Sequence, residues 1–122
     1  MYAAPYDYAA IAPAGRTLFT AGACPIDESG VVVAPDDLEA QARLVLDNLR
    51  AVLAEHGADY SHLVKTTVLV ATADRSELVR VWNVYEAELA PHRPPSTLVG
   101  VAVLGYAGQR VEVEAVAVLG PR

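Results

Sequence analysis

Two strand-like segments of this chain have apolar residues on both faces, and they constrain the fold more than any other feature. Residues 63–71 are rich in β-branched side chains, and residues 96–104 are apolar on both faces beyond Thr97. A sheet with helices on one face is usually polar on the other. A chain of 122 residues has no further element to cover a second apolar face. We therefore expect a closed homo-oligomer; the alternative is that the N-terminal segment, Tyr2 to Pro13, folds over this face.

Two amphipathic helices are expected. Asp36 is a favourable N-cap with Glu39 three residues later, and Gly57 is a typical helix stop. A second helix is expected to start at Asp74 and to end before Pro91. Apolar side chains repeat at helical spacing in both segments: Leu38, Ala42, Val45, Leu46, Leu49, Val52 and Leu53 in the first, and Leu78, Val81, Trp82, Tyr85 and Leu89 in the second.

Three further strands are expected over residues 17–21, 31–33 and 111–119. The resulting order is β-β-α-β-α-β-β, an α+β domain with two helices on one face of a mixed sheet. Prolines and glycines are scattered at turns, and no linker or repeat interrupts the chain. Residues 1–122 are therefore expected to form one domain.

Composition excludes several classes of protein. Hydrophobic residues make up 53% and charged residues 20%, which excludes a disordered chain. The net charge of −6 disfavours binding to a phosphate backbone, so no nucleic-acid partner is expected. The longest apolar run, residues 98–104, is shorter than the roughly 20 residues that span a bilayer, and the N-terminus lacks a signal-peptide pattern. We expect a cytoplasmic protein without a membrane partner.

Two glutamates are the first candidates for chemistry. Glu112 and Glu114 are two positions apart on a strand, so they point to the same face. Such a pair is usually a solvated edge. However, Val116 and Val118 share this face, and a carboxylate beside an apolar surface can act as an acid or a base. Both interpretations remain open from the residues alone.

The single cysteine, Cys24, excludes an intramolecular disulfide and a multi-cysteine zinc site. Its simplest role is that of a small buried apolar residue; a nucleophile would need a base, and no histidine lies nearby in sequence. The three histidines lack metal-ligand spacing, so no metal site is expected. The chain also lacks the glycine-rich phosphate loops of dinucleotide and nucleotide binding, so no cofactor is expected.

Two further segments have an open interpretation. Tyr2, Tyr6 and Tyr8 form either a packed surface arm or the wall of a pocket. Residues 92–97 contain two prolines that stiffen the chain, so they form either a ligand-presenting loop or a plain connector.

Taken in order, several short motifs resemble the Rid/YjgF family of reactive-intermediate deaminases, also known as L-PSP endoribonucleases. These motifs are Pro5-Tyr6, residues 19–22 with Pro25, residues 41–43 with residues 46–49, residues 64–68, Val84-Tyr85, Arg93-Pro94 with residues 99–101, and residues 111–115. The resemblance implies a chorismate-mutase-like α+β fold. It also implies a homotrimer with a ligand pocket at each subunit interface.

Family members with deaminase activity hydrolyse enamine or imine intermediates that pyridoxal-phosphate enzymes release. The resemblance places the family's water-positioning glutamate at Glu112 and its pocket tyrosine at Tyr6. The family's asparagine aligns with Trp82. The arginine that holds the substrate carboxylate, the second in the usual Arg-Pro-Ala-Arg-Thr motif, aligns with Ser96. Arg93 occupies the first arginine position, which is not the anchor.

The missing arginine has an energetic consequence. Serine cannot replace a bidentate arginine–carboxylate pair. Hydrogen bonds to charged groups contribute about 1.5–3 kcal/mol, which corresponds to roughly ten- to a hundred-fold in binding. We therefore expect weak or absent turnover of substrates such as 2-aminoacrylate or 2-iminopropionate.

Three hypotheses follow. The first is a hydrolase of the arginine-less type, in which Glu112 positions water and Tyr6, Cys24, Trp82, Arg93 and Ser96 shape a substrate pocket suited to an aromatic or uncharged ligand. The second is a non-catalytic small-molecule binder or regulator on the same scaffold. The third is a ribonuclease or translation inhibitor, which the net charge of −6 disfavours.

Overall fold

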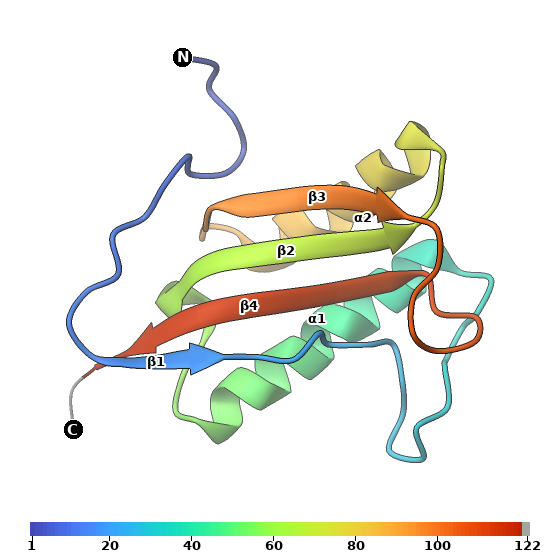
Figure 1. Ribbon diagram of the computed structural model, residues 1–122, viewed down its shortest axis with the longest axis horizontal. Coiled ribbons are helices and arrows are strands. Elements are labelled where there is room, and N and C mark those ends of the chain that lie inside the picture. Colours follow the sequence, from blue (N-terminus) through green and yellow to red (C-terminus); the bar gives the residue numbers. More distant parts are fainter. Residues whose placement is uncertain (121–122) are drawn as a thin grey trace.

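The computed structural model describes residues 1–120 and has two layers, a mixed sheet and a pair of helices (Figure 1). In chain order the elements are β1 (Arg16–Phe19), α1 (Leu38–Glu55), a short 3₁₀ helix η1 (Tyr60–His62), β2 (Leu63–Ala71), α2 (Arg75–Leu89), β3 (Ser96–Val101) and β4 (Val111–Leu119). The strand order is β1-β4-β2-β3, with β2 and β3 parallel and the other pairs antiparallel. The expected α+β class, with both helices on one face, is confirmed.

Local signals explain where the helices begin and end. The N-cap of α1 is Asp37 rather than Asp36, and its side chain accepts a hydrogen bond from the Ala40 backbone N–H. Gly57, with a φ of 74°, follows the end of α1 as expected. Asp74 caps α2 by accepting from the Ser76 N–H.

The core lies between the helices and the sheet. Its largest fully buried apolar side chains are Val45, Leu46, Leu49 and Leu53 of α1, Val81 and Leu89 of α2, Val68 and Val70 of β2, and Val111 and Val113 of β4. Each set follows the period of its element, 3.6 on the helices and two on the strands. Burial of these side chains supplies the main driving force for folding.

Three expected strands differ from the observed ones. The strand expected over residues 17–21 is observed as Arg16–Phe19. Residues 31–33 form no strand, and only Val32 makes an isolated bridge, to Ile26. The strand expected over residues 96–104 is shorter than expected, because β3 ends at Val101, the partner of Ala71, where β2 itself ends. Residues 102–104 therefore have no strand to pair with, and the described order is β-α-β-α-β-β.

The sheet face opposite the helices, called the open face below, carries both apolar and polar side chains. Phe19, Leu69, Val99 and Val116 lie on it, and Phe19 is 74% exposed. The Lys65 ammonium donates to Thr97 Oγ1 across the same face. The N-terminal segment does not cover the open face; it passes around one end of the sheet in Figure 1. The alternative in which residues 2–13 cover it is therefore wrong.

No helix formed by residues 1–120 is both long enough and apolar enough to cross a membrane.

Candidate functional site

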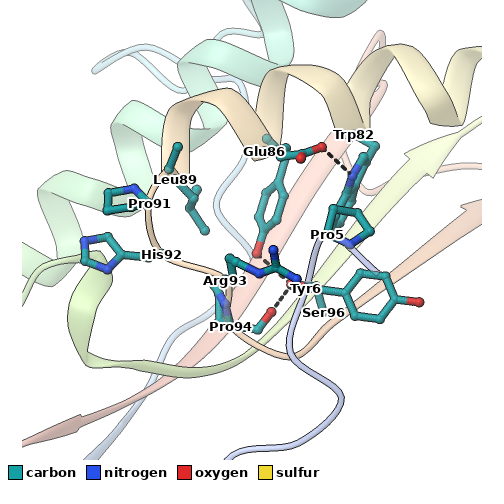
Figure 2. Close-up of a pocket in the computed structure, with 12 residues that line it drawn as sticks. Pro5, Tyr6, Trp82, Glu86, Leu89, Pro91, His92, Arg93, Pro94 and Ser96 are labelled. Atoms are coloured by element: carbon teal, nitrogen blue, oxygen red, sulfur yellow. Dashed lines mark hydrogen bonds between the residues drawn. The ribbon is translucent and has the colours of Figure 1, made fainter. Parts of the chain in front are cut away.

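A cavity of about 140 Å³ lies between the N-terminal segment, the C-terminal half of α2 and the segment that leads into β3. Figure 2 shows its walls, which come from three parts of the chain far apart in sequence. The lining residues are Pro5, Tyr6, Trp82, Tyr85, Glu86, Leu89, Ala90, Pro91, His92, Arg93, Pro94 and Ser96. Most of these side chains are apolar or aromatic, as is usual for small-molecule sites.

Aromatic rings form one wall of the cavity. The Trp82 ring packs against Tyr85, with ring centroids 4.9 Å apart, and Tyr6 meets it edge-on at 5.8 Å. Trp82, Tyr85, Glu86 and Leu89 share one face of α2 because they recur at spacings of three and four residues. The Trp82 indole N–H donates to Glu86 Oε2 at 3.1 Å, so one carboxylate lies beside the rings.

Two hydroxyl groups that line the cavity, those of Tyr85 and Ser96, form a cluster with the buried hydroxyl of Thr66. Ser96 Oγ lies 2.8 Å from both Thr66 Oγ1 and Tyr85 OH, and it donates to the Pro94 carbonyl at 2.8 Å. Burial raises the pKa of Tyr85, so its hydroxyl stays protonated. The Ser96 hydroxyl is thus already engaged within the chain.

Arg93 joins the N-terminal segment to this cavity. Its guanidinium donates to the Ala4 carbonyl, and its own carbonyl accepts from the Asp7 N–H at 2.9 Å. These two contacts hold Tyr6 beside Trp82. Arg93 therefore acts as a structural anchor of the cavity wall in this conformation.

Glu112 lies in a second cluster, at the start of β4 on the open face, where it pairs with Leu69. Its Oε1 accepts from the Cys24 thiol at 3.2 Å and from Gln109 Nε2 at 3.1 Å. A Cβ added at Gly22 would collide with this carboxylate and would lie 2.7 Å from its Cγ. Any larger residue at position 22 would therefore have to displace the Glu112 side chain.

The surroundings of Cys24 explain its protonation state. Burial, followed by the hydrogen bond and the charge of Glu112, raises the pKa of the Cys24 thiol from 9.0 to about 11. A thiol with so high a pKa is protonated at neutral pH and is a poor nucleophile. Asn48 Nδ2 holds the backbone of residues 24–26, because it donates to the carbonyl of Cys24 at 2.9 Å and to the carbonyl of Ile26 at 3.2 Å.

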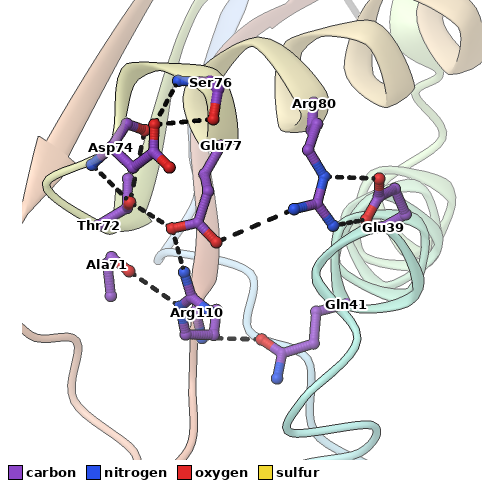
Figure 3. Close-up of polar contacts among 9 residues, drawn as sticks. All are labelled: Glu39, Gln41, Ala71, Thr72, Asp74, Ser76, Glu77, Arg80 and Arg110. Atoms are coloured by element: carbon purple, nitrogen blue, oxygen red, sulfur yellow. Dashed lines mark hydrogen bonds and ion pairs between the residues drawn. The ribbon is translucent and has the colours of Figure 1, made fainter.

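The segment before β4 is held by polar contacts from both helices (Figure 3). Arg110 donates to the Ala71 carbonyl at 2.9 Å and pairs with Glu77 at 2.8 Å. Hydrogen bonds from Thr72 and Arg110 lower the pKa of Glu77. Arg80 links α2 to Glu39 of α1 through two further bonds. This network fixes the end of the sheet at which Glu112 lies.

The residues that the sequence suggested for one pocket form two groups. Tyr6, Trp82, Arg93 and Ser96 meet at the cavity, whereas Glu112 and Cys24 lie together elsewhere. Ser96 pairs with Thr66, which bonds to Tyr85 on the helix-covered face. Glu112 pairs with Leu69, three residues further along β2 and therefore on the open face. Within one chain the two groups do not form a single site.

Sequence reasoning missed Gln109, Glu86 and Gln41. Gln109 is 4% exposed and contacts Glu112, and Gln41 is fully buried. Gln109 lies in a loop, where no periodicity marks a buried position. Across residues 1–120, no group of three or more His, Cys, Asp or Glu side chains is arranged to hold a metal ion.

Comparisons with known proteins cover almost the whole chain. Residues 1–119 match the family model described as Endoribonuclease L-PSP. The chain is 36% identical over 114 residues to Protein DfrA of Myxococcus xanthus, covering 93% of this chain and 85% of that protein. It is 35% identical over 106 residues to the mouse 2-iminobutanoate/2-iminopropanoate deaminase, covering 87% and 76% of the two chains.

Solved structures agree with these sequence matches. The Rid-family protein YyfB from Yersinia pestis, described as a protein of unknown function, superposes with a TM-score of 0.87 at 29% identity, covering 94% of this chain and 87% of that one. The YjgF product of E. coli superposes with a TM-score of 0.73 at 35% identity, covering 95% of each chain. With a matching family model, deaminase relatives and a shared fold, this chain belongs to the Rid/YjgF family.

Proposed function

We propose that this protein hydrolyses a small imine or enamine, with Glu112 as the residue that activates water. The observation that carries the proposal is the Glu112 carboxylate, held through Oε1 by Cys24 and Gln109. Relatives that are 35% and 36% identical are named 2-iminobutanoate/2-iminopropanoate deaminases, which supports the same reaction class here.

The proposed reaction has a simple balance. Glu112 accepts a proton from water while the water oxygen bonds to the imine carbon. The carboxyl group then returns this proton to nitrogen, which gives a carbinolamine. In the second step the carboxylate passes the hydroxyl proton of the carbinolamine to nitrogen, the carbon–nitrogen bond breaks as the carbonyl forms, and a carbonyl compound and ammonia leave. A general acid–base group of this kind contributes typically about 10²–10⁴-fold to the rate.

The cavity favours a substrate without a carboxylate that must be clamped. The resemblance noted in the sequence aligns Ser96 with the carboxylate-binding arginine of the family, and the Ser96 hydroxyl is bonded to neighbouring oxygen atoms. Arg93 holds the N-terminal segment. The rings of Tyr6 and Trp82 offer apolar contact instead. We therefore propose an aromatic or uncharged imine, and weak turnover of 2-iminopropionate.

The proposed assembly is a homotrimer in which each site combines two copies. Glu112 and the cavity lie on different faces of the sheet within one chain. The proposed arrangement is one in which a second copy covers the apolar side chains of the open face and presents its own cavity to Glu112. The proposed location is the cytoplasm, where a lone cysteine stays reduced.

The test compares two glutamates on one strand face. We expect Glu112→Gln to lose most of the turnover of an imine substrate while its melting temperature stays near that of the wild type. Glu114→Gln is the matched control, because Glu114 is exposed and lies two residues along the same face. Equal turnover by Glu112→Gln and the wild type would contradict the proposed hydrolase.

One observation favours a second candidate, a non-catalytic binder of small molecules. The cavity is complete within one chain, whereas the proposed catalytic site needs a second copy. A binder would retain ligand affinity in Glu112→Gln and would show no turnover in the wild type. Calorimetric titration of both proteins with an uncharged aromatic imine analogue distinguishes the two functions.

A further inference from the structure

The side chain of Gln109 has an unusually complete set of partners for a loop residue. Its amide Nε2 donates to Glu112 Oε1 and to the Val111 carbonyl, both at 3.1 Å, and its Oε1 accepts from the Tyr106 N–H at 3.1 Å. With 4% exposure, the amide has little freedom to exchange these partners for water. The Tyr106 contact also fixes which end of the amide faces Glu112, because only the NH₂ end can donate.

The loop that carries Gln109 is itself held from α1. Gln41, which has no exposed surface, donates from Nε2 to the Gly108 carbonyl at 2.9 Å and to the Ala34 carbonyl at 3.2 Å. Its Oε1 accepts from the Arg110 N–H at 2.7 Å. The residues on both sides of Gln109 are thus tied to one buried side chain, visible beside Arg110 in Figure 3.

Both donors to Glu112 reach the same oxygen. Cys24 and Gln109 bond to Oε1, and among residues 1–120 no donor bonds to Oε2, which lies above Gly22. A carboxylate held by one oxygen keeps its second oxygen at a fixed place with lone pairs free. This difference between the two oxygens suits a carboxylate that must accept a proton from one water molecule in a fixed geometry.

We propose that Gln109 is a positioning residue, which with Cys24 holds Glu112 through Oε1 so that Oε2 is the oxygen that exchanges the proton. The catalytic part of this inference rests on the proposed function. The structural part, that Gln109 keeps Glu112 against Cys24, does not. Gln41 acts one step further away, by holding the loop.

The single cysteine provides a test that needs no substrate. Cys24 is the one thiol of the chain, and the contact with Glu112 suppresses its ionisation. Alkylation by iodoacetamide at about pH 9 follows the thiolate fraction. We expect Glu112→Gln to be alkylated about three- to tenfold faster than the wild type, because the negative charge beside the thiol is lost and the remaining amide oxygen is a weaker acceptor.

Gln109→Met is the deciding variant. If Gln109 holds Glu112 in place, its loss frees the carboxylate and speeds alkylation of Cys24 several-fold. If Glu112 stays without it, alkylation is unchanged or slower, because the Gln109 contact by itself lowers the pKa of the thiol. Gln109→Asn, which keeps an amide but withdraws it by one methylene, should show the same direction and serves where the methionine variant folds poorly.

A double variant separates positioning from general loosening. In a Glu112→Gln background, Gln109→Met should add no further acceleration, since its effect acts through Glu112. Acceleration of equal size in both backgrounds would overturn the proposal. Tyr60→Phe is the control, because it also removes one buried hydrogen bond, to the Leu46 carbonyl, without contact with this cluster. Its alkylation rate should match the wild type.

Kinetics with an imine substrate complete the test. We expect Gln109→Met to lower kcat by about tenfold or more with KM nearly unchanged, as expected when an interaction is made chiefly in the transition state. If the wild type does not turn over the imine, but Gln109→Met speeds alkylation only when Glu112 is present, the proposed function is refuted and the positioning role of Gln109 stands. If the wild type is active but Gln109→Met speeds alkylation equally with and without Glu112→Gln, the proposed function stands and the positioning role of Gln109 is refuted.

Discussion

Glu112 and Glu114 share a strand face, yet they have different surroundings. Glu112 is half-buried and accepts bonds from Cys24 and Gln109, whereas Glu114 is exposed. The sequence could place both on one face, because the period of a strand is two. The strand pattern alone could not rank them, because the two donors to Glu112 come from residues 88 and three positions away in the chain; only the family resemblance favoured Glu112.

Gly22 is the residue on which the Glu112 geometry depends most simply. We expect Gly22→Ala to displace the Glu112 carboxylate, because the new methyl group would occupy its place. Imine turnover should fall toward that of Glu112→Gln, and Cys24 should be alkylated faster. Steady-state kinetics and alkylation rates measure both effects. Gly30→Ala, whose added methyl group would meet no neighbour, is the spatial control, although its positive φ carries some strain of its own.

At the scale of elements, long periodic segments were predictable and irregular ones were not. Both bounds of β2 agree with its β-branched run, and α2 begins after Asp74 as expected. The expected strand at residues 31–33 does not join the sheet, because this segment bonds to the one just before it: the Val33 N–H donates to the Pro25 carbonyl and the Asp27 N–H donates to the Val31 carbonyl. The sequence could not predict whether Asp36 or Asp37 caps α1, since aspartate is a favourable N-cap at either position.

Gln41 connects α1 with the loop before β4. We expect Gln41→Leu to lower the free energy of unfolding by about 2–4 kcal/mol, because two carbonyls and one N–H lose their partner in a buried place. Tyr60→Phe, which removes one such bond, should cost about 1 kcal/mol. Urea unfolding followed by circular dichroism compares the two. A cost for Gln41→Leu no larger than that for Tyr60→Phe would contradict this account.

The Glu77 network should make stability depend on pH in the acid range. Its pKa is lower in the folded protein than the ordinary 4.5, because Thr72 and Arg110 bond to the charged form. The stabilisation is therefore complete above about pH 4.5 and is lost as pH falls through the folded-state pKa. Thermal melts should show Glu77→Gln destabilised at neutral pH, with the gap closing in acid. Glu55→Gln, an exposed helix-end change away from Thr72 and Arg110, is the control for the loss of one surface carboxylate.

At the scale of the whole molecule, the open face is the feature that a single chain leaves unexplained. We expect light scattering to give about three times the chain mass of 12.9 kDa, because association removes Phe19, Leu69, Val99 and Val116 from water. Phe19→Lys should shift the protein toward the monomer. Val52→Lys, an exposed change on α1 in the helix layer, should not. A wild-type mass near 13 kDa would contradict the proposed assembly.

The placement of Glu112 and the cavity on opposite faces has a genetic consequence. If each site borrows its carboxylate from one copy and its cavity from the next, two inactive alleles can complement each other. Co-expression of Glu112→Gln chains with chains whose cavity is blocked would rebuild an intact site wherever the sound halves meet, at about a quarter of all positions for random mixing. Two variants that both lack the carboxylate, or that both have a blocked cavity, would form no intact site. Co-expression of pairs of variants would therefore show whether a residue contributes to the carboxylate part or to the cavity part of the site.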